Sequence, residues 1–100
     1  MILLLALIII SHHSFAENTE LSLGGKVTNG GEAVPFVAVY IKGTNHGTTT
    51  DENGFFFISG ITEQDAQLTI KGIGYKTTHY PVSDMDHSGQ TVIEIEQDVQ

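Results

Sequence analysis

Apolar and polar residues alternate along most of this chain after its first sixteen residues, a pattern typical of half-buried β-strands and not of helices. The alternating stretches are short and are separated by Gly, Asn and Asp, which favour turns. The predicted strands are 21–28, 37–42, 47–50, 55–59, 67–73, 75–82 and 91–97. Six to seven short strands at spacings of about ten residues predict an all-β sandwich.

One side of each predicted strand carries the apolar residues, and this side is expected to face the core. Between these positions lie polar residues such as Thr69 and Lys71, which are expected to face solvent. The predicted core consists of Leu23, Val27, Val39, Ile41, Phe56, Ile58, Leu68, Ile70, Tyr75, Ile93 and Ile95.

The first sixteen residues have a different pattern. An unbroken apolar run, Ile2 to Ile10, is followed by small residues at Ser14 and Ala16. This form is typical of a secretory signal peptide cleaved after Ala16. The run is about half the ~20 residues that a membrane-spanning helix needs, so a retained anchor is the weaker interpretation. A buried N-terminal strand is the other alternative. We therefore predict a signal peptide at 1–16, a domain at 17–100, and export.

Charge and cysteine content exclude several classes of protein. The net charge is −8, with four lysines and no arginine. Nucleic-acid binding requires clustered cations, so it is not expected, and an anionic lipid surface is also disfavoured. The chain has no cysteine. An exported fold must then rest on packing and hydrogen bonds instead of disulfides, and no cysteine can accept a lipid.

The stretch from Thr48 to Gly60, TTTDENGFFFISG, contains an acidic turn that resembles part of a calcium loop. An EF-hand loop needs glycine at its sixth position and a glutamate at its twelfth, and neither follows Asp51 at the required spacing. The alternative is a hairpin turn in which the Asp51 carboxylate binds nearby backbone N–H groups and Asn53-Gly54 supplies positive φ. We predict the turn, and no metal site.

Other polar residues were considered as catalytic or binding groups. His46, His79 and His87 lie in separate segments without zinc-ligand spacing, and Asp86-His87 lacks an accompanying nucleophile. The loop around Asn45 and His46 has hydroxyl and amide groups that suit a sugar, although threonine is common in strands for steric reasons alone. The sequence therefore predicts no enzyme activity, no cofactor, and carbohydrate only as a weak alternative ligand.

Three consecutive phenylalanines leave two rings outside the core. With Phe56 inward, Phe55 and Phe57 must point to the opposite side of the strand. Tyr40 has the same outward position on the second predicted strand. If these strands are near neighbours, Tyr40, Phe55 and Phe57 form an exposed aromatic patch, which is typical of a protein-contact surface. The alternative is that a neighbouring loop covers the rings.

Several motifs together are similar to one known family. They are Gly25-Lys26-Val27-Thr28, Val39-Tyr40-Ile41-Lys42-Gly43-Thr44, Gly47 to Gly54 (GTTTDENG) and Gly74-Tyr75-Lys76. The chain from about Leu21 to Glu96 resembles the carboxypeptidase-regulatory-like domains, above all those at the N-termini of TonB-dependent outer-membrane receptors of Bacteroidota. One departure is Pro35-Phe36, where Pro-Gly is common in that family.

The resemblance implies a seven-stranded, transthyretin-like (immunoglobulin-like) sandwich without catalytic activity. It also implies a periplasmic domain at the outer membrane that contacts a protein partner, either the plug and barrel of the same nutrient receptor or another periplasmic protein. The domain would then meet the membrane only through that receptor. The alternatives are a free-standing secreted module that binds carbohydrate or protein, and an accessory domain of a secreted metallocarboxypeptidase.

Overall fold

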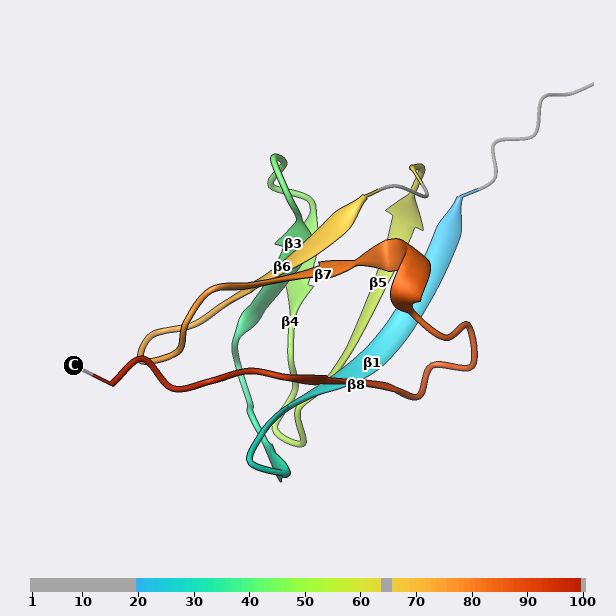
Figure 1. Cartoon of the computed structure of the whole chain (residues 1–100). Coiled ribbons are helices and arrows are strands. Elements are labelled where there is room, and N and C mark those ends of the chain that lie inside the picture. Colours follow the sequence, from blue (N-terminus) through green and yellow to red (C-terminus); the bar gives the residue numbers. More distant parts are fainter. Residues whose placement is uncertain (1–19, 64–65, 100) are drawn as a thin grey trace, which may run out of the picture.

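The structure is a computed structural model that describes residues 20–63 and 66–99; the predicted signal peptide at 1–16 lies outside these residues. Eight strands form two four-stranded sheets that pack face to face (Figure 1). The expected all-β sandwich is thereby confirmed. Across the described ranges, no helix has the length and apolar character needed to cross a membrane.

The first sheet, sheet A, is built around the long strand β1 (Leu21–Asn29). Strand β5 (Phe55–Ile61) pairs antiparallel with β1, and β8 (Thr91–Glu94) pairs parallel with it. Because β5 and β8 both pair with the same two central residues of β1, they lie on opposite sides of it. The two-residue strand β2 (Glu32–Ala33) pairs with the end of β1.

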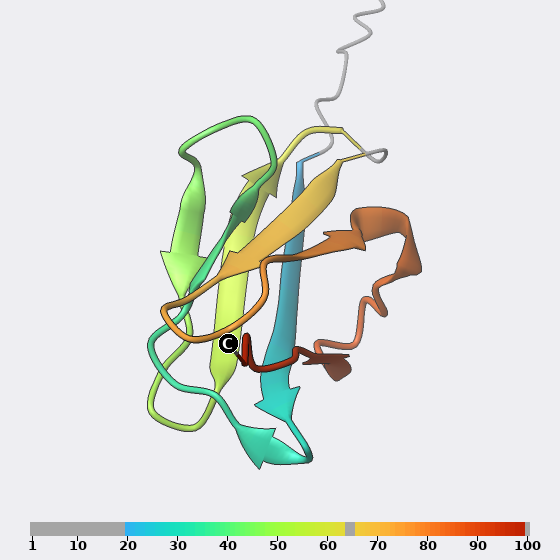
Figure 2. The same ribbon diagram turned by 60° about the vertical axis from the view of Figure 1, so that its left-hand side comes forward.

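The second sheet, sheet B, is antiparallel and has the order β4-β3-β6-β7. Its strands are β3 (Ala38–Ile41), β4 (Gly47–Thr49), β6 (Gln67–Lys71) and β7 (Thr78–Pro81). The chain passes from sheet A to sheet B after β2 and again after β5, and returns after β4 and β7. Edge strands β4 and β5 of the two sheets lie side by side (Figure 2).

The core lies between the two sheets and contains most of the predicted residues. Ile41 and Tyr75 are corrections, because both are only partly buried and pack against the edge of the core. Tyr75 lies outside the regular strands, where its backbone makes an isolated bridge to Gln97. Among the described residues, the buried apolar ones are Leu23, Val27, Val34, Val37, Val39, Phe56, Ile58, Ile61, Ala66, Leu68, Ile70, Val82, Met85, Ile93 and Ile95.

The core residues that alternation missed are mainly in connections. Val34 and Val37 belong to the crossing segment between β2 and β3, and Val82 begins a short 3-10 turn, Val82–Asp84. Thr69 is a further correction. It was expected in solvent but is 3% exposed, and its Oγ1 lies 3.1 Å from Nδ1 of His79 on the neighbouring strand. A cross-strand neighbour covers this threonine from outside.

The acidic turn has the hydrogen bonds expected of a hairpin. Oδ1 of Asp51 accepts the backbone N–H groups of Asn53 (2.8 Å) and Phe55 (3.0 Å). Gly54 has a φ of 80°, which an L side chain rarely adopts. The predicted interpretation of DENG as turn chemistry is confirmed.

The crossing from sheet A to sheet B is held by Thr50. Its buried hydroxyl donates to the carbonyl of Val34 (2.9 Å) and accepts the N–H of Val37 (3.0 Å). Between these two residues, Phe36 has a φ of 61° and its side chain is 70% exposed. A bulky residue in this left-handed region is strained. Glycine, which the family resemblance leads us to expect at this position, would adopt the same φ without this strain.

Candidate interaction surface

Two of the three consecutive rings lie on the outer face of sheet A, as predicted. Phe56 is 5% exposed and belongs to the core, whereas Phe55 is 48% and Phe57 63% exposed. The described part of the chain places no loop over them that would bury them. Strand alternation alone therefore separates one core ring from two outward rings on β5.

Strand pairing places the outward rings beside β1 and, beyond it, β8. Phe57 is paired with Gly24, and its Cδ1 lies 3.8 Å from where a Cβ at Gly24 would be. Phe55 is paired with Lys26, whose Nζ is 5.1 Å from the ring centroid, a cation–π distance. On the other side, Lys26 is paired with Val92, which is 57% exposed. We call Phe55, Phe57 and Val92, with Gly24 and Lys26 between them, the sheet A patch.

Tyr40 does not belong to this patch, which corrects the expected aromatic cluster. It lies on β3 in sheet B, paired with Gly47 and Thr69, and is half-buried. Since its neighbour Val39 faces the core, Tyr40 points to the outer face of sheet B. That face is opposite to the one that carries Phe55 and Phe57. Alternation along a strand shows that all three side chains point outward, but they could form one surface only if their strands belonged to the same sheet.

Val92 is the member of the patch that sequence reasoning missed. The signal was present, because Val92 is an apolar residue at an outward position next to the inward residue Ile93. The sequence does not reveal the parallel pairing of β8 with β1, which places Val92 beside Lys26, 66 positions earlier in the chain.

An ionised carboxylate marks the rim of sheet A beyond Val92. Oε1 of Glu94 accepts the hydroxyl of Thr28 (2.6 Å), and Oε2 accepts the N–H of Gly30 in the β1–β2 turn. The hydrogen bond from Thr28, and then that from Gly30, lowers the pKa of Glu94. The carboxylate thus ties the last strand to the first turn.

The described histidines and remaining acids lie in separate parts of the fold. Nε2 of His46 is 2.6 Å from the carbonyl oxygen of Ser59, and His79 contacts Thr69. Oδ1 of Asp86 accepts the N–H of Ser88 (2.9 Å), which lowers the pKa of Asp86. Within residues 20–63 and 66–99, no group of three His, Cys, Asp or Glu residues is placed to hold a metal ion.

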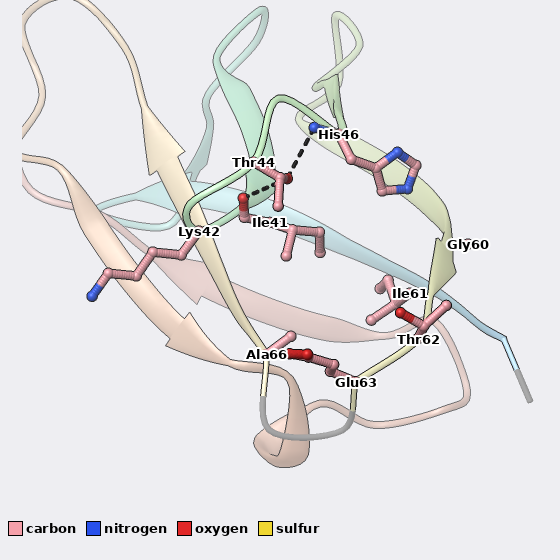
Figure 3. A pocket seen from close by; sticks show the side chains of 9 residues that line it. All are labelled: Ile41, Lys42, Thr44, His46, Gly60, Ile61, Thr62, Glu63 and Ala66. Atoms are coloured by element: carbon pink, nitrogen blue, oxygen red, sulfur yellow. Dashed lines mark hydrogen bonds between the residues drawn. The ribbon is translucent and has the colours of Figure 1, made fainter.

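One hollow of about 290 Å³ lies between the β3–β4 loop and the end of β5 (Figure 3). Ile41, Ile61 and Ala66 line it, while the side chain of Lys42 and the ring of His46 point away from it. Glu63 is a further charged residue of the lining and lies beside Ala66 (Figure 3).

The sequence was compared with models of known protein families. The model of the CarboxypepD_reg-like domain family matches residues 23–100. The chain belongs to this family. The match covers both sheets of the CarboxypepD_reg-like domain, from the inward residue Leu23 of β1 to the end of the chain. A comparison with curated proteins found no match. CarboxypepD_reg-like domains are in general non-catalytic.

Proposed function

We propose that this chain is a non-catalytic, periplasmic domain at the N-terminus of a TonB-dependent outer-membrane nutrient receptor, where it contacts protein through the sheet A patch. The observation that supports contact is the exposure of Phe55, Phe57 and Val92 on one face of an acidic domain. Exposed apolar patches tend to mark contact surfaces. Fully burying an exposed side chain of this size stabilises by about 1.5–3 kcal/mol.

The physical character of the patch favours protein over other partners. Phe55 and Phe57 offer rigid aromatic area, and Lys26 between Phe55 and Val92 adds one cation. Aromatic residues are enriched at protein interfaces because they bury large areas at low entropic cost. With one lysine in the patch and a chain charge of −8, a polyanion finds no cluster of cations there.

The receptor assignment rests on the family and on the motifs from Gly25 to Lys76. The apolar N-terminal segment, interpreted as a signal peptide cleaved after Ala16, supports export. The partner surface would then be the plug and barrel that follow in the same receptor, or another periplasmic protein. The two alternatives, a free-standing secreted module and an accessory domain of a metallocarboxypeptidase, predict different neighbouring sequence.

The reading frame beyond codon 100 tests the receptor assignment. A plug followed by a long series of amphipathic strands is the expected result. A stop codon within a few residues would instead select the free-standing module, and an adjoining domain with zinc-ligand motifs would select the peptidase accessory domain.

A binding measurement tests the patch itself. The full chain and its Phe55→Ser/Phe57→Ser variant are titrated against the plug-and-barrel part of the receptor, with Thr49→Ala on the opposite face as the matched control. We expect the double variant to lose binding and the control to retain it. Equal binding by all three proteins, with unchanged melting temperatures, would show that the patch is not the contact surface.

A further inference from the structure

The outer face of sheet B carries a shallow hollow of about 370 Å³. Ala38 and Tyr40 of β3, Gly47 and Thr49 of β4, and Asn45 of the intervening loop line it. The pairing of Tyr40 with Gly47 and of Ala38 with Thr49 places these four residues in two adjacent rows. The hollow is therefore built on paired strands, which are more rigid than loops.

Small residues leave the face of the hollow open beside the tyrosine ring. A Cβ at Gly47 would lie 2.4 Å from Cβ of Tyr40 and 2.5 Å from the carbonyl oxygen of Val39, so only glycine fits there. Ala38, the neighbour of Thr49, adds only a methyl group. Gly47 and Ala38 thus form a low floor beside Tyr40 in the lining of the hollow.

The polar groups around this floor are not used in holding the fold. Among the described residues, no hydrogen bond involves Oη of Tyr40, the amide of Asn45 or Oγ1 of Thr49. The nearby hydroxyl of Thr44 is different, because it donates to the carbonyl of Ile41 (2.9 Å) and accepts the N–H of His46 (3.0 Å). Two hydroxyls and one amide are thus available to a ligand as donors and acceptors.

The lining contains no charged residue, although the chain has twelve acidic residues and four lysines. The lining itself offers no cation to an anionic ligand and no carboxylate to a cationic one; Lys71 of β6, the partner of Ala38, lies beside it. A peptide that adds to the sheet needs a long free edge. The edge strand β4 offers three residues, which favours a ligand that lies on the face.

We propose that this hollow binds a neutral saccharide, with one sugar ring stacked on Tyr40 and its hydroxyls bonded by Asn45 and Thr49. A sugar ring combines an apolar C–H face with a rim of hydroxyl groups, and it matches an aromatic ring surrounded by uncharged donors and acceptors. His46, considered from sequence as a sugar ligand, is held by Ser59 and is not part of the site. The inference does not depend on the receptor assignment, because the hollow is on the opposite face from the sheet A patch.

An NMR titration of the 15N-labelled full chain tests this site. The probes are neutral hexasaccharides of α-1,4-glucose, β-1,4-xylose and β-1,4-mannose, with hexagalacturonate as the charged comparison and a threonine-rich pentapeptide as the strand-addition comparison. With at least one neutral probe we expect amide shifts at Ala38, Tyr40, Gly47 and Thr49. Absence of shifts there with all three neutral probes overturns the proposal, as does saturation by the peptide or the uronate alone.

Substitutions then assign the roles. Tyr40→Ala and Asn45→Ala should each weaken binding by roughly tenfold or more, whereas Tyr40→Phe should keep the stacking and bind nearly as well as the parent. Glu52→Gln in the exposed turn before β5, outside both surfaces, should leave the affinity unchanged. If Tyr40→Ala unfolds the protein, the loop variant Asn45→Ala decides; parental affinity in Asn45→Ala would overturn the proposed site.

Discussion

The two outer faces of this sandwich differ in chemistry although their strands follow the same alternation. The face of sheet A presents Phe55, Phe57 and Val92 beside the stem of Lys26. The face of sheet B presents Tyr40 with small and hydroxylated neighbours. Inward positions of both sheets are constrained by packing in one core, whereas outward positions are not. The outward residues therefore determine which kind of partner each face can bind.

The largest expected effect separates the two sides of β5. Phe56→Ala should lower the free energy of unfolding by about 3–5 kcal/mol, because it leaves a cavity in the core. Phe57→Ala, one residue later on the exposed side, should lower it by less than about 1 kcal/mol. Urea unfolding followed by circular dichroism gives both values. Similar losses in the two variants would mean that the outer face of sheet A is covered.

A second pair of variants compares a glycine on each outer face. Gly47→Ala on sheet B should cost about 1–3 kcal/mol of unfolding free energy, because the added Cβ would clash with Tyr40 and with the backbone of Val39.

Gly24→Ala on sheet A is the matched control. The nearest atom to its added Cβ would be the carbonyl oxygen of Phe56 at 3.4 Å, an ordinary contact. Its unfolding free energy should stay within about 0.5 kcal/mol of the parent. The same urea curves measure both glycine variants. A larger loss of stability in Gly24→Ala than in Gly47→Ala would contradict the closer contacts around Gly47.

A substitution in the segment that crosses between the sheets should change the free energy of unfolding by a smaller amount and should raise it. Phe36→Gly should raise the free energy of unfolding by about 0.5–1 kcal/mol, since glycine relieves the left-handed strain but gives back part of that gain as backbone entropy. Phe36→Ala keeps the strain and should not stabilise. If Phe36→Gly is less stable than the parent in thermal unfolding, the ring supplies packing that its 70% exposure does not indicate.

The smallest expected effect is on stability at low pH, through the carboxylate of Glu94 at the end of β8. The pKa of Glu94 is lower in the folded state than in the unfolded chain. Its ionised carboxylate therefore stabilises the fold above the unfolded pKa of about 4.3. This stabilisation is lost as the pH falls through the lower pKa of the folded state. Glu94→Gln should therefore show a smaller drop in melting temperature between pH 6 and pH 3 than the parent.

Asp86→Asn tests the same reasoning in the loop before β8. The pKa of Asp86 is also lowered, through the N–H of Ser88, and this substitution should likewise reduce the acid sensitivity. Parental pH profiles in both variants would show that these two hydrogen-bonded carboxylates do not set the response to acid.

Sequence reasoning succeeded where the physical cause is local. The strands, most of the core and the DENG turn follow from side-chain alternation and from the conformational preferences of Asp and Gly. The predicted core omitted Val34, Val37 and Val82, which the structure buries in connections between the strands. Thr69 was misplaced because its cover, His79, comes from a neighbouring strand.

The candidate surface shows the same division. The sequence by itself determined that Tyr40, Phe55 and Phe57 point away from the core, since successive residues of a strand face opposite sides. Only the tertiary structure decided that Phe55 and Phe57 share a face with Val92 and that Tyr40 lies on the other sheet beside Gly47. The physical reason is that strand pairing joins residues distant in sequence through backbone hydrogen bonds common to all residues, so side-chain pattern alone does not specify the neighbour.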